Sequence, residues 1–278
     1  MISTISVGGT RPFRPAWAAL GLAAACAAWP AAAQEQSQVQ LEQAGGGRAD
    51  GWSVMLGGGG VLRPKYDGAD AYALRAFPAI SVSYDKGLFF AGPAGIGVTA
   101  LDWHGLRAGP VLGFQYGRKE DDDIHLKGLG DIQPSLTAGL FASYAMGAFS
   151  LRGTVRQALT HQANGLYGNV SLNWAHPLIP GRLLFTASVQ TAFASGSYDR
   201  TYFGVSPEQS LQSGLPAYTP GGGIKDVGFN ASLDYRLSRH WGLRGFAGVT
   251  QLLGDDGNSP VVLNKTQGLV GLGVGYRF

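Results

Sequence analysis

A period of two in hydrophobicity recurs along the chain from Gly51 to Phe278. In the last segment, alternate residues of Val270–Phe278 are apolar, and glycines and one arginine lie between them. Successive side chains of a β-strand point to opposite faces, so this alternation predicts strands with one apolar face. Eleven segments of about ten residues show the pattern, separated by turn residues such as Asp85-Lys86-Gly87.

The composition favours a membrane barrel over a soluble β-sandwich, which is the main structural alternative. Only 14% of the residues are charged, against about a quarter in soluble domains. After the N-terminal segment, no apolar run approaches the ~20 residues of a membrane helix. In a membrane barrel, lipid-facing apolar residues alternate with lumen-facing residues. Such a chain can have few charged residues without containing a long apolar run. Aromatic residues near strand ends would then form interfacial girdles rather than a sandwich core: Tyr84, Tyr116, Tyr144, Trp174, Tyr235, Trp241, Tyr276 and Phe278.

We therefore predict an all-β fold, a transmembrane antiparallel up-and-down β-barrel. Single-chain barrels of this kind have an even number of strands, so about 12 are expected, with about 10 as the alternative. The strand hidden among the eleven clear segments is expected within 88–101. Long connections over 118–133, 194–226 and 252–265 are expected at the outer end, opposite short periplasmic turns. The apolar terminal strand with its final aromatic residues, Tyr276 and Phe278, predicts a signal for the outer-membrane assembly machinery.

The N-terminus predicts an exported protein. Arg11 and Arg14 precede an alanine-rich apolar stretch, which ends at small residues before Gln34. This pattern is typical of a signal peptide over 1–33, cleaved after Ala33, and a buried or membrane helix is the weaker alternative. A polar periplasmic tail over 34–50 and the barrel over 51–278 would follow. The expected location is the outer membrane of a Gram-negative bacterium, in contact with lipid and lipopolysaccharide.

The sequence shows no pattern of catalytic or cofactor-binding residues. The single cysteine, Cys26, lies in the predicted leader, and the five histidines are far apart in sequence. We expect no metal site, no cofactor and no enzymatic activity, although a hydrolase site at the barrel rim remains a third hypothesis. The acidic run 120–123 is interpreted as a solvated loop, in preference to a calcium site. Without the leader, 19 of the 21 basic residues remain against 18 acidic ones, so no nucleic-acid partner is expected.

The polar faces of the segments are rich in arginine. One hypothesis is a cationic passage for small anions, because a ring of one charge selects the other. The alternative is a plugged barrel, in which the arginines pair with loop carboxylates of 121–123 or with Asp226 and the 194–226 loop fills the lumen. The predicted lumen residues are Arg75, Arg107, Arg152, Arg156, Arg182, Asp234, Arg244 and Arg277.

Several motifs occur in the order typical of one family of outer-membrane proteins. They are Gly117-Arg118, His161 with Gly165, Tyr202-Phe203-Gly204-Val205, Ser213-Gly214-Leu215-Pro216-Ala217-Tyr218, Gly223, Tyr235, Trp241, Ser259-Pro260 and Tyr276-Arg277-Phe278. In this respect the chain resembles the MipA/OmpV family over roughly 51–278.

The resemblance implies an outer-membrane barrel with a structural or scaffolding role. The name-giving member is similar to a scaffold that links a lytic murein transglycosylase to a murein synthase, so these two enzymes are the expected partners. Other members are described as antigens, adhesins or stress-related surface proteins. The leading expectation is a scaffold for the murein-synthesising machinery, and the alternative is a channel for small, anionic solutes.

Overall fold

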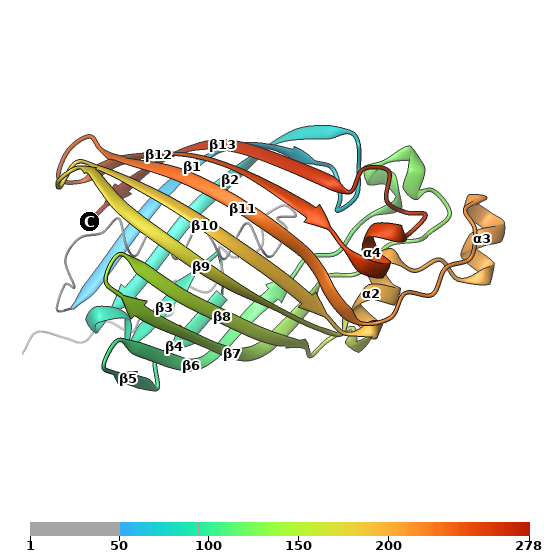
Figure 1. Ribbon diagram of the computed structural model, residues 1–278, viewed down its shortest axis with the longest axis horizontal. Coiled ribbons are helices and arrows are strands. Elements are labelled where there is room, and N and C mark those ends of the chain that lie inside the picture. Colours follow the sequence, from blue (N-terminus) through green and yellow to red (C-terminus); the bar gives the residue numbers. More distant parts are fainter. Residues whose placement is uncertain (1–50, 94) are drawn as a thin grey trace, which may run out of the picture.

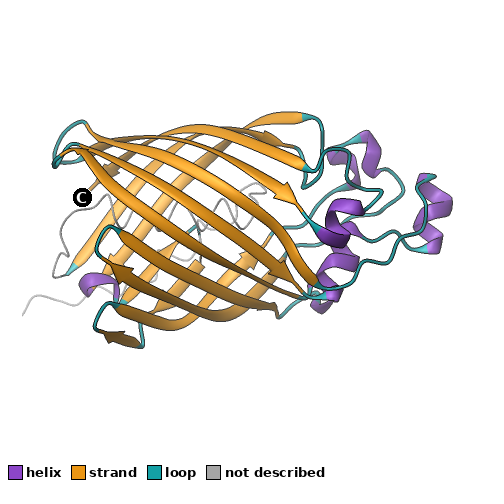
Figure 2. Cartoon of the chain, in the orientation of Figure 1, coloured by secondary structure: helices purple, strands orange, loops and turns teal. Residues whose placement is uncertain are grey.

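The computed structural model describes residues 51–93 and 95–278, so the predicted leader over 1–33 and tail over 34–50 lie outside the described residues. One antiparallel sheet closes on itself as a barrel (Figures 1 and 2). The strands are β1 (Trp52–Pro64), β2 (Tyr72–Tyr84), β3 (Phe89–Gly92), β4 (Gly95–Val98), β5 (Leu101–Trp103), β6 (Leu106–Gln115), β7 (Ser135–Met146), β8 (Phe149–Ala158), β9 (Leu166–Ile179), β10 (Leu183–Ala194), β11 (Gly223–Arg236), β12 (Trp241–Leu252) and β13 (Thr266–Arg277).

Twelve strand positions form the barrel, which confirms the predicted fold class and strand number. The strands β4 and β5 both pair with β6, one after the other, and so act as a single interrupted strand. The hidden strand does lie in the predicted stretch, where β3 and β4 form a short hairpin. Pairing of β1 with β13 closes the sheet and brings Met55 opposite Arg277.

The alternation in the sequence sorts the side chains as predicted. Outward positions carry exposed apolar residues such as Leu74, Leu112 and Val189, whereas inward positions carry buried polar residues such as Ser188 and Asn230. No helix in the described residues is long and apolar enough to cross a membrane.

The two ends of the barrel differ strongly. The 3-10 helices η4 (Glu120–Asp122) and η5 (Ile124–Leu126) and the α-helices α2 (Gly196–Phe203), α3 (Pro207–Ser213) and α4 (Gly254–Asn258) lie in the connections that were predicted to be long. The 3-10 helix η6 (Gln162–Asn164) lies in the β8–β9 connection, which was not among them. The three α-helices lie together at one end, opposite the C-terminus (Figure 1). We call this end the loop end and the opposite one the turn end. Long connections are typical of the outer side of such barrels, so we expect the turn end to face the periplasm.

Glycines line the closing seam between β1 and β13 on the inner face. Gly57 lies opposite Gly275, and Gly59 lies opposite Gly273. A Cβ atom on Gly59 would overlap the carbonyl oxygen of Leu272 and lie 2.7 Å from the ring of Phe77. The close approach of the two backbones therefore requires glycine here, and a neighbouring aromatic ring covers the exposed backbone.

Candidate functional site

The loops pack into a cap over the loop end of the barrel. One hydrophobic cluster joins the loops to each other: Tyr66, Ala69, Leu126, Leu129, Val205 and Val261. A second cluster packs α2 against strand ends in the barrel mouth: Tyr167, Ala192, Ala194, Tyr198, Phe203 and Leu252. The helix begins where it does because the Ser195 side chain accepts a hydrogen bond from the Tyr198 amide. In the described residues, the loop end of the lumen is thus covered by a small packed core.

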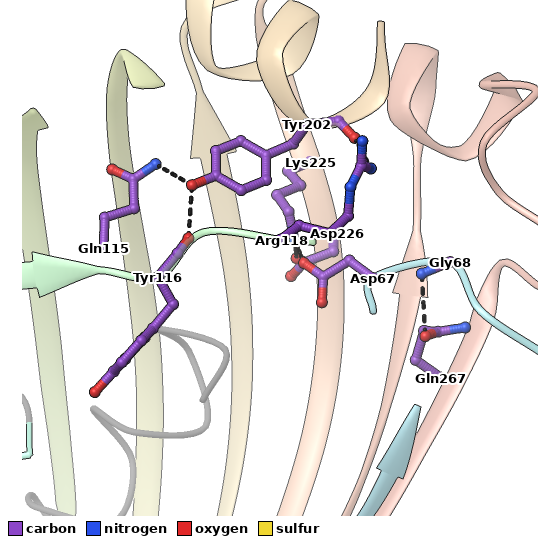
Figure 3. A network of polar contacts seen from close by, with 9 residues as sticks. All are labelled: Asp67, Gly68, Gln115, Tyr116, Arg118, Tyr202, Lys225, Asp226 and Gln267. Carbon is purple, nitrogen blue, oxygen red and sulfur yellow. Dashed lines mark hydrogen bonds and ion pairs between the residues drawn. The ribbon is translucent and has the colours of Figure 1, made fainter. Parts of the chain in front are cut away.

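An ion triad of two buried residues and one exposed residue lies beneath this cap. The Nζ atom of Lys225, on β11, is 3.1 Å from an Oδ atom of Asp67 and 2.9 Å from one of Asp226 (Figure 3). Only 5% of Lys225 and 2% of Asp226 is exposed. Burial would raise the pKa of Asp67, but the positive charge of Lys225 outweighs it and holds that pKa below its usual range. The triad ties the β1–β2 loop to the barrel wall.

Hydrogen bonds hold α2 in the mouth. The Tyr202 hydroxyl donates to the carbonyl oxygen of Tyr116 at 2.7 Å and accepts from the Gln115 side chain at 3.1 Å (Figure 3). The guanidinium of Arg118 donates to the carbonyl oxygen of Tyr202 at 2.8 Å. Burial raises the pKa of Tyr202 to about 12, so the hydroxyl stays protonated and can keep donating.

Several motifs behind the family resemblance meet in this cap. Arg118 contacts Tyr202, as described above. The Ser259 hydroxyl donates to the carbonyl oxygen of Phe203, and the carbonyl oxygen of Pro260 lies 3.0 Å from an imidazole nitrogen of His125. Gly165 has a φ of +68°, and a Cβ atom there would lie 2.5 Å from the Tyr198 amide nitrogen. The motifs are far apart in sequence, and the fold brings them together around α2.

Two buried carboxyl groups face each other between α2 and α4. Asp199 is 3% exposed and Asp256 is 2% exposed. Burial raises the pKa of Asp199 to about 6. Burial and the nearby charge of Asp199 raise the pKa of Asp256 to about 8. Like charges this close cannot both ionise cheaply, so the pair holds a proton near neutral pH.

The acidic run 120–123 forms ion pairs rather than a cluster. Asp121 pairs with Lys127, and Asp123 lies 3.0 Å from the Lys65 ammonium. Asp122 lies 3.9 Å from the Arg75 guanidinium. No group of three or more potential metal ligands occurs among the residues that the structure describes.

The predicted lumen residues lie at different depths. Arg244 and Asp234 are directly opposite on β12 and β11, with Nε and Oδ1 2.6 Å apart. Arg107 lies 3.6 Å from the carboxylate of Asp102 and donates to the carbonyl oxygen of Gly87. Arg75 lies near the carboxylate of Asp122 in the β6–β7 loop. The plugged alternative proposed pairs of this kind between lumen arginines and the carboxylates of 121–123. The others are placed as follows: Arg152 and Arg156 on the inward face of β8, Arg277 at the end of β13, and Arg182 exposed in the β9–β10 turn over the ring of Tyr235.

Three interior cations were absent from the predicted lumen set. Arg63 and Arg118 are 7% and 9% exposed, and Lys225 completes the ion triad. Alternation along the first strand would have identified Arg63, because it lies two residues after the buried Val61. Arg118 follows the end of β6, beyond the reach of the alternation rule.

A cavity of about 270 Å³ opens at the turn end. Its walls include apolar side chains and arginines: Met55, Phe77, Leu184, Phe246, Arg236, Arg244 and Arg277. The rings of Phe77 and Phe246 are 6.2 Å apart. The interior thus combines a polar, covered loop end with an amphipathic cavity at the turn end.

Comparison with known proteins indicates the family. The solved structures that resemble the chain include an outer membrane channel from Pseudomonas putida F1, with 10% identity and a TM-score of 0.42, covering 83% of this chain and 96% of that one. The toluene transporter TodX of Pseudomonas putida has 11% identity and a TM-score of 0.37, covering 82% and 89%.

Among curated proteins, the MltA-interacting proteins of Escherichia coli and Shigella flexneri are each 26% identical over 160 residues. These matches cover 58% of this chain and 63% of each relative, so the chain spans less than two thirds of their length. The family model described as MltA-interacting protein MipA matches residues 56–278. Because that match covers most of the chain, the protein belongs to the MipA family of outer-membrane β-barrel proteins.

Proposed function

We propose that the protein is a non-catalytic scaffold of the outer membrane that binds a lytic transglycosylase at its periplasmic turn end. The observation that carries the proposal is the positive rim of this end. The β9–β10 turn contributes Arg182, and the β11–β12 connection contributes Arg236, Arg239 and His240. Arg277 lies beside them at the end of β13, and these connections contain no acidic residue.

A positive rim is complementary to a partner with an acidic surface, which it would attract and orient. The relatives are named for interaction with a lytic transglycosylase, and such an enzyme would approach from the periplasm. A murein synthase would then be recruited through the bound enzyme. The cap supports the same proposal, because a covered loop end suits a protein whose contacts lie on the inner side of the membrane.

Binding of the refolded barrel to a purified lytic transglycosylase tests this proposal. We expect Arg182→Glu with Arg239→Glu to weaken binding at least tenfold at low salt, with a smaller effect at high salt. Lys119→Glu at the loop end is the matched control and should leave binding unchanged. Equal binding by the unmodified barrel, the double arginine variant and Lys119→Glu would refute the role of the rim.

An anion channel is the second candidate, favoured by the arginines around the turn-end cavity. Discrete, anion-selective openings of the reconstituted barrel in planar bilayers would favour it. We expect a silent barrel, because the cap covers the loop end in the described residues. A silent bilayer with a correctly folded barrel would leave the scaffold as the better account.

We further propose that the assembly machinery recognises Tyr276 and Phe278 and inserts the barrel among lipid and lipopolysaccharide. Phe278 is 67% exposed at the turn end, and its ring lies 4.8 Å from that of Tyr276. Its amide donates to the carbonyl oxygen of Val54, so the terminus is fixed to the first strand. An exposed Phe278 ring beside Tyr276 on an ordered terminus can be bound by another protein without unfolding the barrel.

A further inference from the structure

The turn-end cavity has a positively charged mouth. Arg182 and Arg239 lie in turns and Arg277 ends β13, and all three line the cavity. Among the described residues that line it, Asp234 is the only acid, and its carboxylate already pairs with Arg244. No ion pair of Arg182, Arg239 or Arg277 occurs in the part of the chain that the structure describes. The mouth therefore carries positive charge that the described wall does not neutralise.

The segments that carry these arginines are fixed to one another. The Arg236 amide donates to the carbonyl oxygen of Arg182, which joins the β9–β10 and β11–β12 connections (Figure 1). The Arg277 amide donates to the carbonyl oxygen of His240, and Nδ1 of His240 donates to the carbonyl oxygen of Arg277 at 2.9 Å. The backbone positions of the charges are thus set before a ligand binds, which lowers the entropic cost of binding.

Repulsion between like charges makes the mouth favourable for an anion. Arg236 is close enough to Arg277 for the two guanidinium groups to repel each other. Arg182 and Arg239 add exposed positive charges on the same cavity. A carboxylate near such groups relieves the repulsion and accepts charge-assisted hydrogen bonds, for which the guanidinium geometry is well matched. The mouth therefore fits a ligand that carries carboxylates.

The wall behind the arginines is apolar. The lining side chains there include Met55, Phe77, Leu184 and Phe246, and the rings of Phe77 and Phe246 are 6.2 Å apart. The volume of about 270 Å³ is below the range of roughly 300–1,000 Å³ that is typical of small-molecule pockets. The cavity therefore has room for one large apolar side chain. An apolar pocket inside a charged border is the arrangement that holds an anchor residue in protein–protein interfaces.

We propose that this cavity receives a segment of a periplasmic protein in which a large apolar side chain is flanked by carboxylates. The apolar side chain packs against the Phe77 and Phe246 rings, and the carboxylates face Arg182, Arg239 and Arg277. Because the loop end is covered, the segment enters from the turn end. The inference rests on the scaffold function proposed above, since it names the feature by which the rim recognises the lytic transglycosylase.

Binding of designed peptides tests this inference without the enzyme. The probe is a short fluorescent peptide in which one phenylalanine is flanked by glutamates, added to the folded barrel in lipid nanodiscs and followed by fluorescence anisotropy. We expect a peptide with glutamine in place of glutamate, and one with serine in place of phenylalanine, each to bind at least tenfold more weakly. Equal binding of either control peptide, or no binding of the probe, would overturn the inference.

Matched variants of the barrel locate the bound peptide. Ala79→Trp fills the cavity from the inner face of β2, whereas Ala247→Trp adds the same ring to the outer face of β12. We expect the first to weaken binding of the probe at least tenfold and the second to leave it unchanged. Ala79→Leu, with an expected loss of at least threefold, serves if the tryptophan variant does not fold. Binding that is insensitive to the Ala79 variants would refute insertion into the cavity.

The same variants separate this inference from the scaffold function when the purified lytic transglycosylase replaces the peptide. Weaker binding by both Ala79→Trp and the double variant Arg182→Glu with Arg239→Glu supports both proposals. Weaker binding by the arginine variant alone supports the scaffold and refutes the insertion. Binding of the peptide but not of the enzyme supports the cavity site and refutes the scaffold.

The competing occupant is a segment of this chain itself. Residues 34–50 precede β1 at the turn end and contain Glu35 and Glu42. Removing this segment should change the affinity for the probe less than twofold. Binding of the probe only after its removal would assign the cavity to residues 34–50 and overturn the inference.

Discussion

Replacing Lys225 by methionine should destabilise the barrel far more than the loss of a surface ion pair would. The ammonium group lies 2.9 Å from Asp226 and 3.1 Å from Asp67, and Asp226 is only 2% exposed. Methionine preserves the length of the side chain but removes the charge. A buried carboxylate would then remain without its cation, and removal of one partner of a buried pair costs about 3–5 kcal/mol.

The matched control is Lys127→Met at the loop surface. Lys127 pairs with Asp121, and the two side chains are 50% and 78% exposed. Exposed pairs contribute about 0–1 kcal/mol, because water and salt screen them. The free energy of unfolding of both variants would be measured by urea titration of the barrel in lipid vesicles.

The double variant Lys225→Met with Asp226→Asn isolates the charge. Removing both charges should restore part of the lost stability, because no buried ion is left unpaired. If Lys225→Met costs no more than Lys127→Met, or if the double variant is no better than the single one, the triad does not stabilise the cap.

Three further predictions concern the seam, the carboxyl pair and the terminus. Gly59→Val should cost about 3 kcal/mol by overpacking the seam, whereas Gly60→Val, whose nearest neighbour would lie 3.6 Å away, should be nearly neutral in the same urea titration. Because the pKa values of Asp199 and Asp256 are raised to about 6 and 8, their contribution to stability is complete below about pH 4 and is lost as the pH rises towards 8. The slope is up to about 1.4 kcal/mol per pH unit for each proton. Asp256→Asn should flatten this profile, and parallel profiles would contradict the assignment. Deletion of Phe278 should lower the amount of barrel in the outer-membrane fraction of cells, and an unchanged amount would contradict the proposed assembly signal.

The barrel itself could be predicted because alternation is a local property of each strand. It gave the strand number and the inward direction of residues such as Arg244 and Asp234. The rule fails just outside a strand: Arg182 precedes β10 by one residue, so it lies exposed in a turn although it continues the alternation. The division of the stretch 88–101 among β3, β4 and β5 could not be predicted either. Its one polar residue is Thr99, so the stretch shows no alternation of polar and apolar residues.

The cap could not be predicted from local patterns, because its contacts join distant segments. Lys225 meets Asp67 across 158 residues of sequence, and nothing in the neighbourhood of either residue specifies the other. The family motifs were the only feature of the sequence that pointed to the cap residues, because Arg118, Tyr202 and Ser259 occur in the order typical of the family. They mark residues that matter together, but only the fold shows that they surround α2.

The cap and the cavity together determine how the lumen exchanges its contents. The loop end is covered by two hydrophobic clusters and by the ion triad of Lys225, Asp226 and Asp67. Opening it would expose apolar surface and separate buried charges, so exchange at this end requires local unfolding of the cap. The turn end has no such core among the described residues, and its cavity is bordered by arginines and by the rings of Phe77 and Phe246. A solute in this cavity is therefore expected to exchange through the turn end far more readily than through the covered loop end.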